Sequence, residues 1–286
     1  MKKIISLALM ITLSLSLVAC GSKTNDTTEK LSSSEETQSM QDTNGAVAKI
    51  KEKGELILAT SPDYPPYEFK IMENGKEKTV GFDIKIAEEI AKDMGVPLRI
   101  LELDFNGLLV ALNSNKADIV MAGMTPNEER AKAIDFSNIY YSAGQAIIVN
   151  AKNKDSIKTI EDLKGKKVGV QKGSIQEVLA TEQLKGSNVV SLVKLPNIIL
   201  DLKLGNLDAA IVEVPVAEGY VKQFNELSIS DIILKDETNE GNAIAIKKGN
   251  ADLVEQVNST LDRLMQDGSI DKYVVEANEM VNNLTE

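Results

Sequence analysis

The chain has 286 residues, a formal net charge of −11 and no histidine. The negative charge argues against nucleic acid as a partner and against attachment to anionic lipid through clustered basic residues. The lack of histidine excludes Ser-His-Asp and Cys-His catalysis and removes the commonest zinc ligand. No cluster of metal ligands and no nucleotide-binding pattern is visible, so we expect neither a metal nor a cofactor.

Residues 1–19 have the layout of a secretory signal peptide, with Lys2 and Lys3 before an apolar run and small residues before the cleavage point. The run from residue 4 to 18 is short for a transmembrane helix. The four residues that end at Cys20, Leu-Val-Ala-Cys, resemble the lipobox of bacterial lipoproteins, in which the cysteine becomes the lipidated first residue. The alternative is a cysteine that lies at a signal boundary by accident.

Residues 20–45 are almost all polar, with Leu31 and Met40 as the sizeable apolar side chains. Such a segment buries too little surface to offset its ordering entropy, so it predicts a disordered tether. Loss of the signal with its two lysines changes the net charge from −11 to −13. A lipidated Cys20 exceeds the threshold for stable membrane attachment. We therefore expect an extracytoplasmic globular part held at the cell membrane by a lipid anchor.

The folded part begins with strand patterns that alternate with helix patterns. The first of these helices has Ile86, Ile90 and Met94 at near-helical spacing and ends at Gly95, a residue that suits a helix C-cap. Alternation of this kind predicts a parallel sheet with covering helices. The expected strands are 56–60, 97–101 and 117–122, and the expected helices are 82–94 and 105–113.

The second half repeats this organisation. A polar turn with an aspartate leads a buried strand twice, at Asp118 and at Asp208. Two similarly built lobes explain this repeat. The expected strands are 166–170, 189–193 and 209–212, and the expected helices are 173–181, 198–204 and 215–224.

Two β-rich passages, 140–149 and 241–246, are expected to cross between the lobes and to form a hinge. The helix expected over residues 251–267 would then pack on the first lobe. This assigns residues 46–143 plus 238–286 to lobe 1 and residues 144–237 to lobe 2.

The stretch from Met124 to Arg130 predicts a helix start that faces an anion. Thr125 suits the N-cap, Pro126 suits the first helical position, and Glu128 completes a capping box. The preceding strand places these amides at its carboxyl end, where open α/β sheets bind ligands. The alternative is a capped surface helix with Arg130 in a solvated ion pair.

Other segments supply groups for the same cleft. Tyr64 and Phe105 follow strand ends, Ser174 opens a second helix with free amides, and Glu213 follows a strand directly. Together with Arg130 they suit a zwitterion that carries an organic side chain. Taken singly, the aromatics are equally typical of a core, Ser174 of a simple cap and Glu213 of a solvated charge.

In these motifs the chain resembles family 3 of the bacterial extracellular solute-binding proteins, the amino-acid receptors of ATP-driven (ABC) importers. The resemblance covers residues 46–286 and implies a type II periplasmic-binding-protein fold, an α/β architecture of two lobes joined by two crossover strands. It implies a monomer that binds an L-amino acid with a polar or basic side chain and delivers it to a membrane permease. The matching segments are 64–69, 81–84, 124–130, 162–170, 173–177 and 207–210.

The resemblance also implies roles for individual residues. Arg130 would bind the ligand α-carboxylate with Thr125, and Glu213 would bind the α-ammonium. Tyr64 and Phe105 would enclose the side chain of the ligand. The amides that would assist with the carboxylate belong to Gly123, Ile175 and Gln176.

Three departures from the family pattern concern this site. Glu213 replaces a frequent aspartate, Ala122-Gly123 replaces a Ser-Ser pair of the basic-amino-acid receptors, and Ser61 replaces an aspartate that meets a cationic side chain. Nearby acids could substitute, so the residues expected to set selectivity are Ser61, Asp63, Glu68 and Asp104. The alternatives are a sensory or surface interaction module of the same fold, and a dehydratase of small carboxylic acids with Glu213 or Glu68 as general acid.

Overall fold

The computed structural model describes residues 45–234 and 241–284. The expected signal peptide, Cys20 and the tether up to residue 44 lie outside these residues. Within the described part, none of the helices is both long and apolar enough to span a membrane.

The first lobe is built on a five-stranded sheet with the order β4-β1-β5-β12-β6. The parallel arrangement expected from the sequence holds for β4, β1 and β5, whereas β12 runs antiparallel to both of its neighbours. The sequence therefore predicted the parallel half of the sheet and missed its mixed character. The strands are β1 (Leu56–Thr60), β4 (Leu98–Glu102), β5 (Ile119–Val120), β6 (Ile134–Tyr141) and β12 (Asn242–Lys247).

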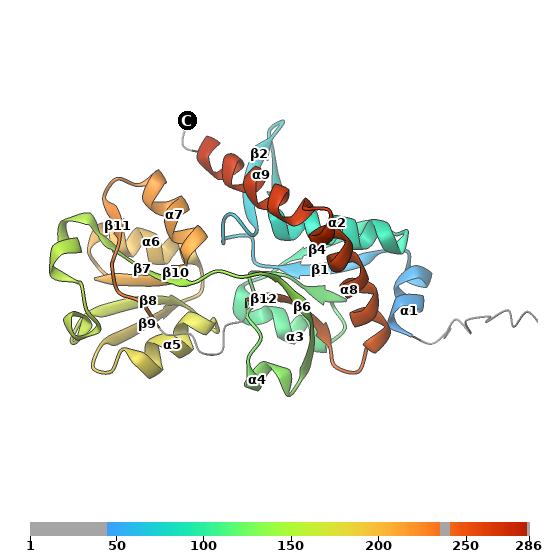
Figure 1. The fold of residues 1–286 in the computed structure, drawn as a ribbon, viewed down its shortest axis with the longest axis horizontal. Helices are drawn as coiled ribbons and strands as arrows, with labels where there is room; N and C mark the ends of the chain where they lie inside the picture. Colours follow the sequence, from blue (N-terminus) through green and yellow to red (C-terminus); the bar gives the residue numbers. More distant parts are fainter. Residues whose placement is uncertain (1–44, 235–240, 285–286) are drawn as a thin grey trace, which may run out of the picture. The chain divides into compact units, whose positions relative to one another are not determined.

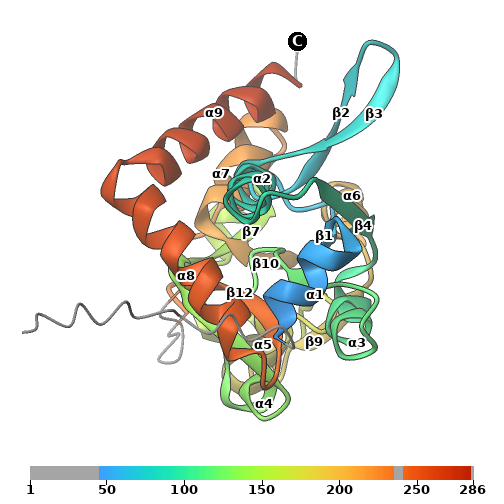
Figure 2. The same ribbon diagram turned by 90° about the vertical axis from the view of Figure 1, so that its right-hand side faces the viewer.

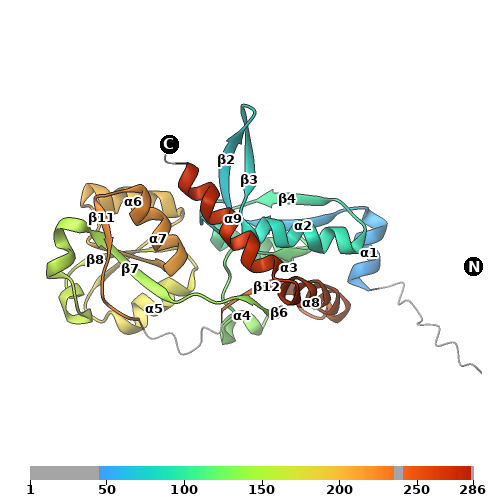
Figure 3. The same cartoon turned by 45° about the horizontal axis from the view of Figure 1, so that its top comes forward.

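Helices cover this sheet because their apolar residues recur on one face. In α2, Ile86, Ile90 and Met94 are buried, and the helix ends at Gly95 in the left-handed conformation, as expected. The C-terminal helix α9 packs on α2 and α8 and also contacts α7 of the second lobe, as Figures 1 and 3 show. The helices of this lobe are α1 (Ala46–Lys53), α2 (Phe82–Met94), η1 (Phe105–Gly107), α3 (Leu108–Asn113), α4 (Glu128–Ala131), α8 (Ala251–Gln266) and α9 (Ser269–Asn283).

The second lobe has a sheet of the same kind, with the order β11-β7-β10-β8-β9. The strands β10, β8 and β9 are parallel, and β7 runs antiparallel to both of its neighbours, β10 and β11. Its strands are β7 (Gln145–Asn150), β8 (Lys167–Gln171), β9 (Asn188–Leu192), β10 (Ala209–Glu213) and β11 (Leu227–Ile229). Its helices are η2 (Ala151–Ser156), η3 (Ile160–Leu163), α5 (Ile175–Gln183), α6 (Leu195–Leu204) and α7 (Val214–Gln223).

The repeated aspartate has the same structural role in both lobes. The carboxylate of Asp118 accepts a hydrogen bond from the amide of Ile57 at 2.7 Å, and that of Asp208 accepts one from the amide of Lys167 at 2.9 Å. Each aspartate thereby ties the start of one central strand to the strand beside it. The interpretation of the repeat as two similarly built lobes is confirmed.

A hairpin of β2 (Phe69–Glu73) and β3 (Lys76–Val80) was not predicted. Its turn is Asn74-Gly75, and both residues have positive φ, 53° and 76°, as a type I′ turn requires. The Asn-Gly signal was therefore present in the sequence and was overlooked. Figure 2 shows the hairpin standing apart from the sheet, on the side of α2 and α9.

The sequence predicted Thr125 as the N-cap of the helix that carries Arg130, and this prediction is wrong by two residues. The helix α4 begins after Asn127, whose side chain accepts from the amide of Arg130 at 2.8 Å. The carbonyl of Met124 accepts from the amide of Ala243 at 2.9 Å, which keeps this part of the chain beside β12. The helix has only four residues and therefore presents no long run of free amides.

Candidate functional site

Segments from both lobes line a small cavity. Seven of the eight residues expected to bind a ligand lie on its wall: Tyr64, Phe105, Gly123, Thr125, Arg130, Ile175 and Gln176. The other lining residues are Ala122, Gln171 and Ser174. Ser174 was expected at the cleft as the start of a helix, whereas Ala122 and Gln171 were not predicted as contacts. Gln171 ends β8 just before the Gly173-Ser174 turn, and its position at a strand end was the signal that could have identified it.

Arg130 is a half-buried cation at this cavity. Its guanidinium donates to the backbone carbonyls of Thr125, at 2.5 Å, and Gly173, at 2.9 Å, and lies 5.7 Å from the ring centre of Phe105. Burial lowers the pKa of Arg130 to about 10, so the group stays charged at neutral pH. No carboxylate of the described residues forms an ion pair with it. The alternative of a solvated ion pair is therefore not what the structure shows.

Thr125 supplies a buried hydroxyl to the same wall. Its side chain is 1% exposed, and its Oγ1 has no hydrogen-bond partner among the described residues. A buried hydroxyl without a partner costs free energy, about 1–3 kcal/mol in proteins. A polar ligand group at the cavity would remove this cost.

Gly123 lies against the ring of Tyr64. Its φ is 53°, and a Cβ on this residue would come within 3.3 Å of that ring. The serine found here in the basic-amino-acid receptors would crowd the aromatic wall, which gives a physical reason for the departure. The amide of Gly123 donates to the carboxylate of Asp83 at 3.1 Å. This amide, expected to assist with a ligand carboxylate, thus already has an acceptor.

The second lobe contributes the start of helix α5. Ser174 is its N-cap, and the Ser174 hydroxyl accepts from the amide of Glu177 at 3.3 Å. The amides of Ile175 and Gln176, the first two residues of the helix, have no acceptor within it. The side chain of Gln176 donates to that of Gln145 at 2.9 Å. The helix therefore presents backbone donors to the cavity while its side chains are fixed by neighbours.

Glu213 is buried at the end of β10, with 1% of its surface exposed. Its Oε1 accepts from the side chain of Asn242 at 3.0 Å, and its backbone amide donates to the hydroxyl of Tyr64 at 3.0 Å. The side chain of Asn242 also donates to the carbonyl of Gly123 at 2.9 Å. Glu213 is thus joined to the residues of the cavity wall and is not a solvated charge.

The four residues expected to set selectivity are not among those that line the cavity. Ser61 is buried and donates to Asp63 at 3.0 Å, while Asp63 is hydrogen-bonded to the second lobe. Glu68 is fully buried, and burial together with the charge of Asp83 raises its pKa well above the usual range. Asp104 is exposed, 3.9 Å from the ammonium group of Lys194.

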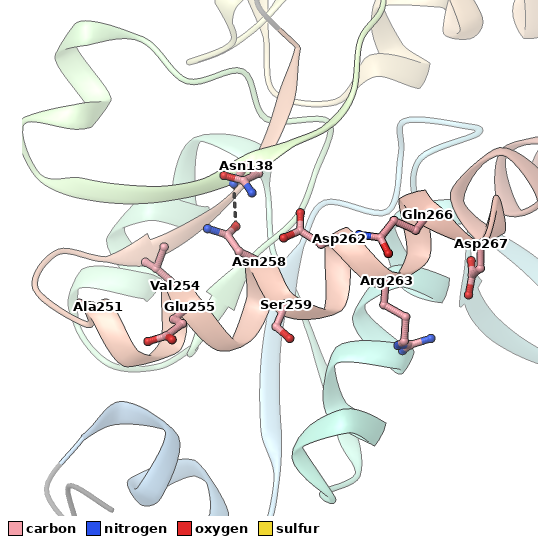
Figure 4. Close-up of a pocket in the computed structure, with 10 residues that line it drawn as sticks. All are labelled: Asn138, Ala251, Val254, Glu255, Asn258, Ser259, Asp262, Arg263, Gln266 and Asp267. Atoms are coloured by element: carbon pink, nitrogen blue, oxygen red, sulfur yellow. Dashed lines mark hydrogen bonds between the residues drawn. The ribbon is translucent and has the colours of Figure 1, made fainter. Parts of the chain in front are cut away.

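A larger open groove lies along helix α8 and next to Asn138 of β6 (Figure 4). Most of the residues that line it are polar, and the backbone amide of Asn138 donates to the side chain of Asn258 at 2.7 Å. None of the predicted site residues lines this groove. Within the part of the chain that the structure describes, no group of three side chains is arranged to hold a metal ion.

Comparisons with known proteins agree with the fold and the cavity described above. The model of the bacterial extracellular solute-binding proteins, family 3, matches residues 56–276. An arginine-binding extracellular protein of Bacillus subtilis is 38% identical over 224 residues, covering 77% of this chain and 84% of that protein. The L-cystine-binding protein of Escherichia coli is 32% identical over 227 residues, covering 79% and 83%.

Among solved structures, an amino acid ABC transporter substrate-binding protein of Streptococcus pneumoniae bound to L-arginine has a TM-score of 0.80. It is 39% identical, and the match covers 82% of this chain and 98% of that one. The fold expected from the sequence is confirmed by this likeness. These relatives carry the names of binding proteins and not of enzymes.

Proposed function

Because this chain belongs to the bacterial extracellular solute-binding proteins of family 3, we propose that it is the substrate-binding lipoprotein of an ABC importer. It captures an L-amino acid with a polar or basic side chain between its two lobes, outside the cytoplasm. It then delivers the amino acid to the membrane permease and performs no chemistry on it. The protein acts as a monomer attached to the cell membrane through a lipid on Cys20.

The observation that carries this proposal is a cation without a carboxylate partner beside a buried hydroxyl without a hydrogen-bond partner. The guanidinium of Arg130 has no carboxylate partner among the described residues, and the hydroxyl of Thr125 has no hydrogen-bond partner there. Both line the same cavity. A planar guanidinium matches a carboxylate with two parallel hydrogen bonds, so an α-carboxylate suits both groups at once. The amides of Ile175 and Gln176 add donors from the other lobe.

The remaining groups suit the rest of an amino acid. The carboxylate of Glu213 accepts the α-ammonium, and the rings of Tyr64 and Phe105 enclose the side chain. L-Arginine is the first ligand to test, because two of the three relatives described above carry arginine in their names. Contacts from both lobes make binding favour the closed form, which is the form that a permease would recognise.

The test is a calorimetric titration of Arg130→Ala with L-arginine. Removing one partner of a buried charged hydrogen-bonded pair costs about 2–5 kcal/mol, so the dissociation constant should rise about 30-fold or more. Arg99→Ala is the matched control, because Arg99 lies on β4 in a surface ion pair with Glu55 at 2.9 Å. Its affinity should equal that of the wild type. Wild-type affinity in Arg130→Ala would contradict the assignment of the carboxylate site.

A further inference from the structure

Asp63 connects the two lobes at a position beside the cavity. It lies in the loop after β1 of the first lobe, and its Oδ2 accepts from the backbone amide of Leu195 at 3.1 Å. The side chain of Gln171 donates to both carboxylate oxygens at 3.3 Å. Leu195 and Gln171 both belong to the second lobe. The carboxylate therefore has three donors, one from Ser61 of its own loop and two from across the cleft.

The partner at Leu195 is electrostatically favourable. Leu195 is the first residue of α6, a helix of ten residues, so its amide has no acceptor within the helix. The N-terminus of a helix carries partial positive charge and favours a nearby carboxylate. The preceding residue, Lys194, adds a full positive charge that lowers the pKa of Asp63. Two separate features of the second lobe thus attract Asp63.

The contact of Asp63 with Leu195 and Gln171 joins the two lobes, so it belongs to the closed arrangement. Burial raises the pKa of its carboxyl, while the hydrogen bonds from Leu195, Ser61 and Gln171 lower it. When the lobes separate, the bonds from Leu195 and Gln171 are lost and water replaces them. The interaction therefore distinguishes the closed form from the open form.

We propose that Asp63 is an interlobe latch, which stabilises closure through the Leu195 amide and the Gln171 side chain without contacting the bound amino acid. This inference rests on the proposed function, because it concerns closure around the same ligand. It replaces the role in side-chain selectivity that the sequence suggested for Asp63. Gln171 lines the cavity and Asp63 does not. The carboxylate of Asp63 therefore lies behind the cavity wall, where it contacts the side chain of Gln171.

A latch has a different signature from a ligand contact. The apparent dissociation constant varies inversely with the population of the binding-competent form, whatever the ligand. Loss of the latch should therefore weaken every ligand by the same factor. An Asp63 that met a cationic side chain would instead affect cationic ligands alone.

The experiment titrates Asp63→Ala and Asp63→Asn with L-arginine and with L-citrulline, its neutral isostere. We expect the dissociation constants of both ligands to rise by the same factor, about tenfold for Asp63→Ala, mainly through faster dissociation. Asp63→Asn keeps the shape of the side chain and should give a smaller but equally uniform increase. Small-angle scattering of the ligand-free Asp63→Ala protein should show a larger radius of gyration than that of the wild type.

Asp155→Ala is the matched control, because Asp155 is an exposed acid of the second lobe that forms a surface ion pair with Lys158 at 3.1 Å. Its dissociation constants should change less than twofold, since exposed ion pairs contribute little. A loss of affinity for L-arginine with no loss for L-citrulline would overturn the latch, as would unchanged affinity for both ligands. Either result would leave the Arg130→Ala test of the proposed function unaffected, so the two failures are distinguishable.

Discussion

Glu68 and Asp83 form a buried carboxyl pair next to the cavity wall, and both are fully buried. Asp83 accepts from the amide of Gly123 at 3.1 Å and from the hydroxyl of Tyr140 at 2.8 Å. Burial raises the pKa of Asp83 to about 6 and, together with the charge of Asp83, raises that of Glu68 well above the usual range. Asp83 is therefore the charged member that holds the Gly123 loop, and Glu68 is the protonated member.

This pair predicts a pH dependence of stability. In the unfolded chain the carboxyl of Glu68 has a pKa of about 4.3, and in the folded protein its pKa is raised. At pH values between these two pKa values, folding therefore takes up a proton. The stabilisation is complete below the unfolded pKa and is lost as the pH rises through the folded pKa. The neighbouring acids Asp63 and Glu213 act in the same direction. Because glutamine does not titrate, the free energy of unfolding of the wild type should fall relative to Glu68→Gln as the pH increases.

Urea denaturation at several pH values between about 5 and 8 measures this difference, which can grow by at most about 1.4 kcal/mol per pH unit. Glu161→Gln is the control, because Glu161 is exposed and its replacement should leave the pH profile unchanged. Parallel profiles for the wild type and Glu68→Gln would contradict a raised pKa of Glu68 in the folded protein.

The site could be predicted from the sequence where a residue type and a chain position were enough. Arg130, Tyr64 and Phe105 follow the carboxyl ends of β5, β1 and β4, and the carboxyl ends of parallel strands lie at the same edge of a sheet. Selectivity could not be predicted in this way. Asp63 turns to the second lobe because an amide and a glutamine lie there, and a single sequence does not say which segments meet across a cleft.

At the scale of the elements, the start of α2 depends on a close approach of two segments. The amides of Phe82 and Asp83 donate to the carbonyls of Pro66 and Tyr67, at 3.2 and 3.0 Å. These carbonyls satisfy amides that the helix itself cannot satisfy. Gly81 permits the approach, because its φ is 132° and a Cβ would overlap the carbonyl of Tyr67.

Gly81→Ala should therefore be severely destabilising. An L side chain is strained at this φ, and the overlap with backbone forces the loop that carries Tyr64 to move. The expected loss is about 3 kcal/mol or more in the free energy of unfolding, measured by urea denaturation. Gly54→Ala is the matched control, since Gly54 has a φ of 80° with nothing near its Cβ position. It should cost about 1 kcal/mol, and an equal cost at the two positions would show that the overlap is unimportant.

Element boundaries were least predictable where two good signals competed. Thr125 and Asn127 are both favourable N-caps. The tertiary bond from Ala243 to Met124 decides in favour of Asn127, because it holds the chain beside β12 for longer. The long helices α2 and α8 have strong periodic faces, and for them the sequence alone was sufficient.

At the scale of the whole molecule, attachment and binding are predicted to be separate properties. The globular part ties its first helix to the fold through Val47, whose amide donates to Asp252 at 2.8 Å. The net charge of −11 does not favour adsorption to anionic lipid, so we expect the proposed lipid on Cys20 to provide the attachment. The two lobes that bind the ligand are built entirely from residues after the tether.

Cys20→Ser should therefore release the protein from the membrane without changing its affinity. The replaced side chain has no thiol to lipidate, and the tether contains too few apolar residues to insert. Fractionation of cells should find Cys20→Ser in the soluble fraction and the wild type in the membrane fraction, while both bind L-arginine with the same dissociation constant. Ser22→Ala, two residues away, should behave as the wild type. If Cys20→Ser stayed in the membrane fraction, the uncleaved apolar run or another surface would be the anchor, and the lipoprotein assignment would be wrong.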